Sequence, residues 1–162
     1  MQQILADTSA TSGFHYSLVK YILSRRRCDM TASIREIVHD YNQAFGDSDF
    51  ERLESLLHPD LVFGGAAKET HGAAEYLAGL RRLAPAVIRN EVKTILVEGN
   101  QAFVLYDFVT DTPAGAVLSG ELLTIDDGLI SSITLLYDMR RWPEFLQSLA
   151  GRVEAAPAAV NS

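Results

Sequence analysis

Three segments in the first half of the chain carry apolar residues at the spacing of an α-helix. Ser33 begins the first segment as an N-cap, Glu36 completes a capping box, and Gly46 ends the helix. The second helix stops before Pro59 and the third before Pro85, because proline lacks the amide hydrogen that a helix interior needs. The apolar faces of the three helices comprise, in chain order, Ile34, Ile37, Val38, Tyr41 and Phe45, then Phe50, Leu53, Leu56 and Leu57, then Tyr76, Leu77, Leu80 and Leu83.

The period of the apolar positions changes to two from Ile88 onward, which predicts strands. Gly99-Asn100 fits a two-residue hairpin, and the three residues from Asp126 to Gly128 fit a hairpin with glycine in the left-handed position. We also expect a short strand at residues 61–63 and a closing helix at residues 142–149. Helices followed by an antiparallel meander predict an α+β domain. Its four long strands are expected over residues 88–98, 101–111, 116–125 and 129–138.

Composition narrows the functions that such a domain can have. The 162 residues suffice for one ordinary domain, and the formal net charge of −7 argues against a nucleic-acid partner, which requires a basic face. Cys28 is the only cysteine, which excludes an intrachain disulfide and a multi-thiolate zinc site. We find no apolar run of membrane-spanning length and no early positive charge typical of a secretory signal. We therefore expect a cytoplasmic protein with no membrane partner.

The two ends of the chain differ from its middle. Residues 1–30 carry four basic and two acidic side chains, a net charge of +2, so the remaining residues carry −9. This segment is either a poorly ordered extension or a short helix, and Met30 is a plausible second start. The predicted organisation is an extension over 1–30, a domain over 31–150 and a tail over 151–162.

Hairpin geometry predicts which strand residues share a face, because residues that oppose each other across a strand pair point the same way. With the turn at Gly128 and a four-residue turn over 112–115, Glu121 opposes Ile133 on one side and Tyr106 on the other. The shared face is mostly apolar and comprises Val104, Tyr106, Phe108, Ser119, Glu121, Leu123, Ile133, Leu135 and Tyr137. A carboxyl group among apolar neighbours resists ionisation, so its pKa rises and it can serve as an acid or base near neutral pH. The alternative is a glutamate that faces solvent.

The order of elements, with the motifs LLHPDLVF, HGAAEYLAGL and IDDGLISSITLLYD, resembles the SnoaL-like branch of the nuclear transport factor 2-like superfamily over residues 33–149. This resemblance implies a cystatin-like cone, in which a curved antiparallel sheet carries three N-terminal helices on its concave face around a small-molecule pocket. The superfamily includes ketosteroid isomerase, polyketide cyclases, dehydratases and epoxide hydrolases, and also proteins without known activity.

The resemblance to ketosteroid isomerase can be followed residue by residue. It places Tyr41 at the oxyanion-hole tyrosine and Glu121 at the protonated aspartate of that enzyme. His39 is the alternative match for the tyrosine if a gap is inserted. The general-base aspartate of the isomerase falls at Gly65, which has no side chain. The chain therefore resembles an isomerase that keeps an oxyanion-binding pair and lacks the base, and steroid isomerisation by the same mechanism is not expected.

The candidate catalytic residues are Glu121, Tyr41 and Tyr106, although either tyrosine could equally be a packed core residue. His71 could act as a base near the mouth of the cone, or it could be a capping or surface residue. No histidines and carboxylates share the spacing of metal ligands, so no metal and no cofactor are expected. The predicted substrate-binding residues are Phe108, Leu123, Ile133, Leu135, Tyr137 and His71.

Three classes of function fit this pattern. The first is an isomerase, cyclase or dehydratase that acts on a compact apolar carbonyl compound by acid–base chemistry. The second is a ligand-binding protein without catalysis, and the third is a dimeric interaction module of the same fold. A homodimer through the outer face of the sheet is expected, because that face carries a row of large apolar residues, Leu105, Leu118, Leu122, Ile130 and Leu136.

Overall fold

The helices of the domain bury most of the apolar positions that the sequence pattern predicts, but Leu57, expected on the second helix, begins the strand Leu57–Gly65 instead. The computed structural model describes residues 31, 33–65 and 69–155, so the N-terminal extension and most of the tail lie outside the described residues. The first helix covers residues 33–46 and already includes Thr31, so Ser33 lies inside the helix and is not its N-cap. Helix α2, Phe50–Leu56, begins at Asp49, whose side chain accepts a hydrogen bond from the amide of Arg52. Helix α3 covers Ala73–Leu83, and α4 covers Trp142–Ala155.

The sheet has six strands in the order β2-β1-β6-β5-β4-β3. Strand β1 pairs with β6 in parallel, whereas the other neighbours are antiparallel. The prediction of a purely antiparallel sheet was therefore wrong at this one pair, and β1 is longer than the three residues expected. Parallel neighbours need a long crossover, and the chain from β2 through α3 to β5 supplies it here. The strand bounds are β1 Leu57–Gly65, β2 Thr70–His71, β3 Val87–Glu98, β4 Gln101–Thr110, β5 Ala116–Asp126 and β6 Leu129–Tyr137.

Both hairpins around β5 differ from the predicted register by two residues. The β5–β6 turn has two residues, Asp127 and Gly128, with φ of 50° and 83°, and Glu121 opposes Leu135 instead of Ile133. Across β4, the residue opposite Glu121 is Val104 instead of Tyr106. Because side chains alternate with a period of two, a shift of two residues leaves Glu121 and its neighbours on β4 and β5 on their predicted faces.

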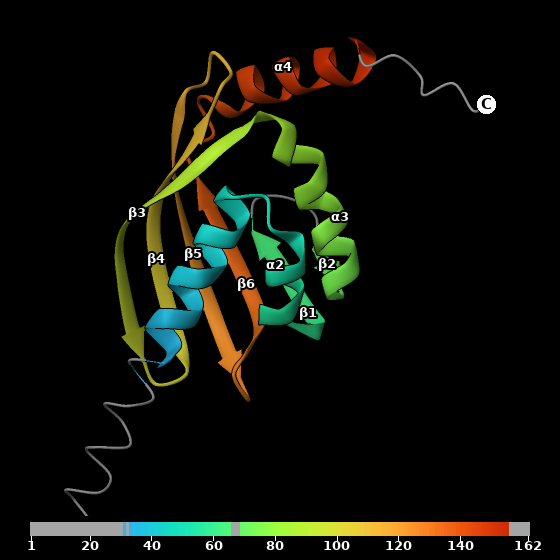
Figure 1. Ribbon diagram of the computed structural model, residues 1–162. Helices are drawn as coiled ribbons and strands as arrows, with labels where there is room; N and C mark the ends of the chain where they lie inside the picture. The colour runs from blue at the N-terminus through green and yellow to red at the C-terminus, as the bar shows by residue number, and fades with distance from the viewer. Residues whose placement is uncertain (1–30, 32, 66–68, 156–162) are drawn as a thin grey trace, which may run out of the picture.

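The helices and the sheet enclose one hydrophobic core. Figure 1 shows the first helix, α2 and α3 lying against one face of the curved sheet, while α4 crosses one end of it. Tyr41, Leu123, Ile133 and Phe145, which come from the first helix, β5, β6 and α4, are all at most 1% exposed. This arrangement is the predicted α+β cone.

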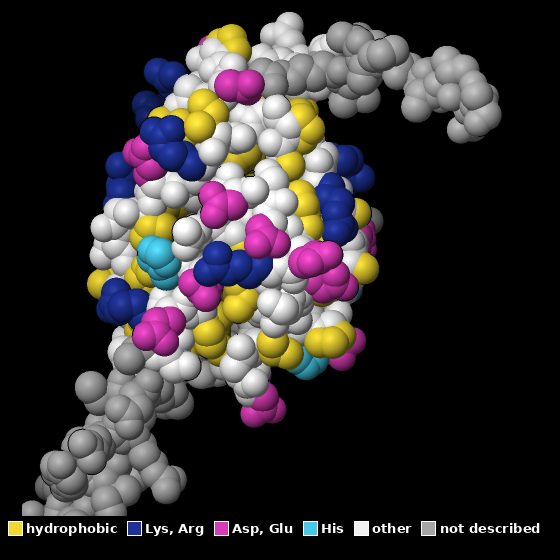
Figure 2. All heavy atoms as spheres, in the orientation of Figure 1, with side chains coloured by type: hydrophobic (Ala, Val, Ile, Leu, Met, Phe, Trp, Pro, Cys, Tyr) yellow, Lys and Arg dark blue, Asp and Glu magenta, His cyan; other side chains and the backbone are white. Residues whose placement is uncertain are grey.

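The outer surface carries charges of both signs. Figure 2 shows basic and acidic side chains interspersed over the face that carries the first helix and α2, with no continuous basic area in this view. No helix among the described residues has the length and hydropathy needed to cross a membrane. On the outer face of the sheet, Leu118, Leu122 and Leu136 are exposed and Leu105 is half-buried.

Ile130 was predicted on this outer face and is instead fully buried. The register between β5 and β6 shifts between Thr124 and Ile125, so that Ile125 pairs with Ile130 while Thr124 pairs with Ser132. Ser131 is thus an extra residue on β6, and its hydroxyl donates to the Thr124 carbonyl. Such a bulge reverses the alternation beyond it, which turns Ile130 towards the core.

Candidate functional site

Glu121 lies near the middle of β5, with β4 and β6 on either side, and is only 4% exposed. The Tyr106 hydroxyl donates to Glu121 Oε1 at 3.1 Å, and the Tyr41 hydroxyl donates to the same oxygen at 3.4 Å. Glu121 Oε2 is buried and has no hydrogen-bond partner among the described residues. A buried carboxyl oxygen without a partner is costly, so it marks a position that a ligand can satisfy.

A third tyrosine extends this network. The hydroxyl of Tyr76, from α3, forms a short hydrogen bond with the hydroxyl of Tyr41. Because Tyr41 donates its hydrogen to Glu121, Tyr76 must be the donor in that bond, which gives a chain from Tyr76 through Tyr41 to the carboxyl group. Tyr41, Tyr76 and Tyr106 come from the first helix, α3 and β4, so three separate elements fix the orientation of one acid.

Burial sets the protonation states in this cluster. Desolvation raises the pKa of Glu121 to about 7, although the hydrogen bonds from Tyr106 and Tyr41 act in the opposite direction by stabilising the ionised form. Burial also raises the pKa of all three tyrosines well above the usual value, and the charge of Glu121 raises it further. Near neutral pH, the tyrosines are therefore neutral donors while Glu121 can hold or release a proton.

The proton of the neutral acid has one favoured position. Glu121 Oε1 already accepts two hydroxyl hydrogens, whereas Oε2 accepts none among the described residues. Hence the acid carries its proton on Oε2, which becomes a donor when protonated and an acceptor when ionised. This single oxygen can perform both halves of a proton transfer.

An apolar cavity of about 180 Å³ adjoins the acid. Of the predicted site residues, Tyr106, Phe108, Glu121, Leu135 and Tyr137 line it, as the alternation of the strands implied. The sequence did not assign the other lining residues to the site, and most of them come from helices and from β1. They are Phe45, Phe63, Tyr76, Leu80, Leu83, Ser119 and Trp142.

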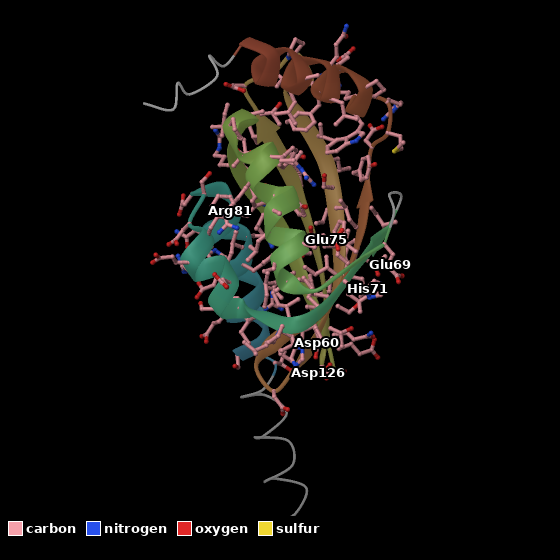
Figure 3. The ribbon with its side chains drawn as sticks, turned by 90° about the vertical axis from the view of Figure 1, so that its right-hand side faces the viewer. Asp60, Glu69, His71, Glu75, Arg81 and Asp126 are labelled. Carbon is pink, nitrogen blue, oxygen red and sulfur yellow. The ribbon has the colours of Figure 1, made fainter. Side chains whose placement is uncertain are left out.

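Four predicted site residues lie outside the lining of this cavity. Tyr41 reaches Glu121 from behind the lining, and Leu123 and Ile133 are fully buried core residues. His71 is exposed and pairs with Glu69 at 2.9 Å. Figure 3 shows these two side chains together at the edge of the sheet where β2 lies. His71 thus contacts solvent and Glu69, because its strand is a two-residue edge strand.

Aromatic side chains form one wall of the cavity where α4 closes the cone. The Trp142 ring lies 4.7 Å from that of Tyr137 and 6.4 Å from that of Phe108, measured between centroids. Phe145, one turn further along α4, packs edge-on against Phe108 at 5.5 Å. Such pairs add stability beyond the area they bury. The contacts of Trp142 and Phe145 hold α4 against the apolar end of the cavity.

Gly65 ends β1 at the position where the resemblance to ketosteroid isomerase places a general base. Its φ is 141°, and a Cβ atom there would lie 2.3 Å from the carbonyl oxygen of Leu135 on β6. Both the backbone conformation and the contact require glycine. This strand end is therefore built without a side chain, and Glu121 is the only carboxyl group among the described residues that line the cavity.

Comparison with protein families matches residues 38–133 to the model described as SnoaL-like domain. Curated protein sequences give no significant match. No group of three or more potential ligands that could hold a metal ion is found in the described part of the chain.

Solved structures with the same fold include three with bacterial or environmental sources. A candidate polyketide cyclase from Sinorhizobium meliloti is 24% identical, with a TM-score of 0.57 over 62% of this chain and 94% of that one. A candidate ketosteroid isomerase from Kribbella flavida is 20% identical, with a TM-score of 0.60 over 67% and 79%. Bal32a, from a soil-derived mobile gene cassette, is 14% identical, with a TM-score of 0.65 over 72% and 98%. At these identities the likeness concerns the fold.

Proposed function

This chain belongs to the SnoaL-like domain family, and we propose that it catalyses proton transfer on a compact apolar carbonyl compound bound in its cone. The observation that carries the proposal is Glu121, a buried acid with a pKa of about 7 whose Oε2 has no partner among the described residues. The apolar lining favours an apolar substrate, and the lone carboxyl group favours chemistry that one acid can complete.

The proposed reaction is an isomerisation or a related cyclisation or dehydration. Ionised Glu121 Oε2 takes a proton from the carbon next to the substrate carbonyl, which leaves an enol or enolate. In an isomerisation the same oxygen returns that proton to another carbon, and in a dehydration it gives the proton to the departing hydroxyl group. In a cyclisation the enolate carbon bonds to the carbon of a second carbonyl group, and the proton goes to the alkoxide oxygen left there. No proton is gained or lost overall. Tyr137 also lines the cavity, and its hydroxyl group can donate to the carbonyl oxygen as negative charge develops there.

The three tyrosines keep Glu121 ready for this role. Tyr41 and Tyr106 hold Oε1 in place, so Oε2 keeps one orientation through both proton transfers. Their hydrogen bonds also lower a pKa that burial alone would raise further, and they bring it close to neutral pH, where general acid–base catalysis is most efficient. The reaction needs no cofactor.

The experiment that tests this function is hydrogen–deuterium exchange at the carbon next to a carbonyl group. Cyclohexanone and 2-cyclohexenone are incubated with the protein in D₂O and followed by NMR. We expect the exchange rate to rise with pH and to level off above about pH 7, and Glu121→Gln to abolish the exchange. Ser119→Ala is the matched control, because Ser119 lines the same cavity but donates to a backbone carbonyl. Binding of the ketones without exchange would favour a ligand-binding protein and count against catalysis.

We also propose that the protein is a homodimer through the outer face of its sheet. Leu96, Leu118, Leu122 and Leu136 are 62%, 48%, 40% and 58% exposed. Apolar residues of this size seldom cluster on the surface of a monomer. Light scattering is expected to give the mass of two chains, and Leu118→Asp with Leu136→Asp to give one. A monomer at micromolar concentration would refute the dimer.

A further inference from the structure

A groove between α3 and α4 adjoins the cavity beside Glu121. The groove has a volume of about 420 Å³. Four residues, Phe63, Tyr76, Leu80 and Leu83, line both the cavity and the groove, so the two spaces share a wall. Figure 3 looks onto α3 with α4 crossing beyond its C-terminal end.

The cavity alone is small for a substrate. Small-molecule sites in proteins usually enclose about 300 to 1,000 Å³, and the cavity falls below this range whereas cavity and groove together fall within it. The far side of the groove is formed by Leu146 and Leu149 of α4, and Leu146 is 46% exposed. An exposed leucine facing an apolar groove gains free energy when an apolar chain covers it.

The floor of the groove contains a glycine in the interior of a helix. Gly79 lies between Glu75 and Arg82 on one side of α3, and a Cβ atom at this position would meet only Arg82 Nη2, at 3.9 Å. Glycine in a helix interior lowers the stability of the helix relative to alanine. Nothing in the local packing of the described residues requires glycine there, since a Cβ atom would make an ordinary van der Waals contact with the flexible Arg82 side chain alone. The missing side chain keeps the groove deep enough for a chain to lie in it.

The charges at the groove are few and well separated. Arg82 is the only cation and Glu75 the only anion among the described residues that line it, and seven residues of helix put them about 10 Å apart. Arg82 has no ion-pair partner among the described residues, whereas the neighbouring Arg81 stacks over the Phe50 ring. A guanidinium group without an ion-pair partner, lying beside Gly79 in an apolar groove, is complementary to a carboxylate.

We propose that the substrate is an elongated oxo acid, with its carbonyl group at Glu121, its unbranched apolar chain in the groove between α3 and α4, and its carboxylate at Arg82. This proposal rests on the proposed function and names the substrate class for it. Glu75 repels a carboxylate from the opposite end of the groove, so the chain has one favoured direction.

The test is calorimetric binding of a homologous series, namely 5-oxohexanoate, 7-oxooctanoate, 9-oxodecanoate and 11-oxododecanoate. We expect each added methylene group to tighten binding roughly two- to fourfold until the groove is filled. Gly79→Leu fills the groove and should remove the dependence on length while the affinity for cyclohexanone stays unchanged. Ala78→Leu is the matched control, because Ala78 is the exposed neighbour on the same helix. Arg82→Gln should weaken binding of the acids about two- to fivefold and leave their methyl esters unaffected.

The outcomes separate this inference from the proposed function. If cyclohexanone exchanges in a Glu121-dependent way but the oxo acids bind with no dependence on length, the groove is not part of the site and the inference fails alone. If esters bind as tightly as acids, the assignment of the carboxylate to Arg82 is wrong. If no carbonyl compound binds or exchanges, both the inference and the proposed function fail. Leucine favours a helix more than glycine does, so Gly79→Leu should not lower the melting temperature. A loss of binding in this variant can then be distinguished from a folding defect.

Discussion

Replacing Glu121 by glutamine should stabilise the protein at high pH and have much less effect at low pH. The pKa of the acid is about 7 in the folded protein and about 4.5 as a free side chain. The folded state therefore binds the proton more tightly than the unfolded state, so Glu121 weakens folding as it ionises. The cost begins as pH rises past about 4.5, grows to about pH 7 and is constant above it.

The size of this effect follows from the two pKa values. One pKa unit corresponds to about 1.4 kcal/mol, so the free energy of unfolding of the wild type should fall relative to Glu121→Gln by about 2.5 kcal/mol between pH 5 and pH 8. Urea denaturation of both proteins at intervals over this range measures it. Taking the difference between the two proteins removes the contribution of every other titrating group that the substitution does not affect. A difference that stays constant with pH would refute the burial of the ionisable group.

Two further predictions concern the surroundings of this acid. Tyr106→Phe removes a hydrogen bond that lowers the pKa of Glu121, so the pKa should rise above about 7, and the plateau of the exchange rate should move to higher pH. Gly65→Ala should lower the melting temperature strongly, since its Cβ would collide with the Leu135 carbonyl at a positive φ, at a cost of roughly 1–3 kcal/mol or more. Gly64→Ala is its control, because a Cβ there meets only Glu69, at 4.0 Å.

The residues that strands contribute to the site could be predicted, because an error of two residues in strand register does not change the face on which a side chain lies. Both hairpins were displaced by two residues, yet Tyr106, Glu121 and Tyr137 stayed on the inner face. A bulge at Ser131 carries no clear sequence signal, so Ile130 was placed on the wrong face. The parallel pairing of β1 was missed because pairing partners distant in sequence leave no local pattern.

The residues that helices contribute to the site were harder to predict. Tyr76 lies on the apolar stripe of α3 in the same way as Tyr41 on the first helix, but only the packing of the two helices brings their hydroxyls together. A tyrosine among leucines on a buried helix face was the available signal, since its hydroxyl needs a partner. Trp142 opens the closing helix as predicted, and its place over the cavity depends on how α4 crosses the sheet.

The most direct test of the proposed chemistry is titration of the Glu121 carboxyl by carbon-13 NMR, with the Glu121→Gln protein used to assign the resonance. We expect a single carboxyl resonance with a midpoint at about pH 7 that is absent from the variant. A midpoint near that of a free glutamate, about 4.5, would contradict this expectation. It would show that the acid is already ionised and solvated at neutral pH, and thus unable to carry the proton that the proposed reaction moves.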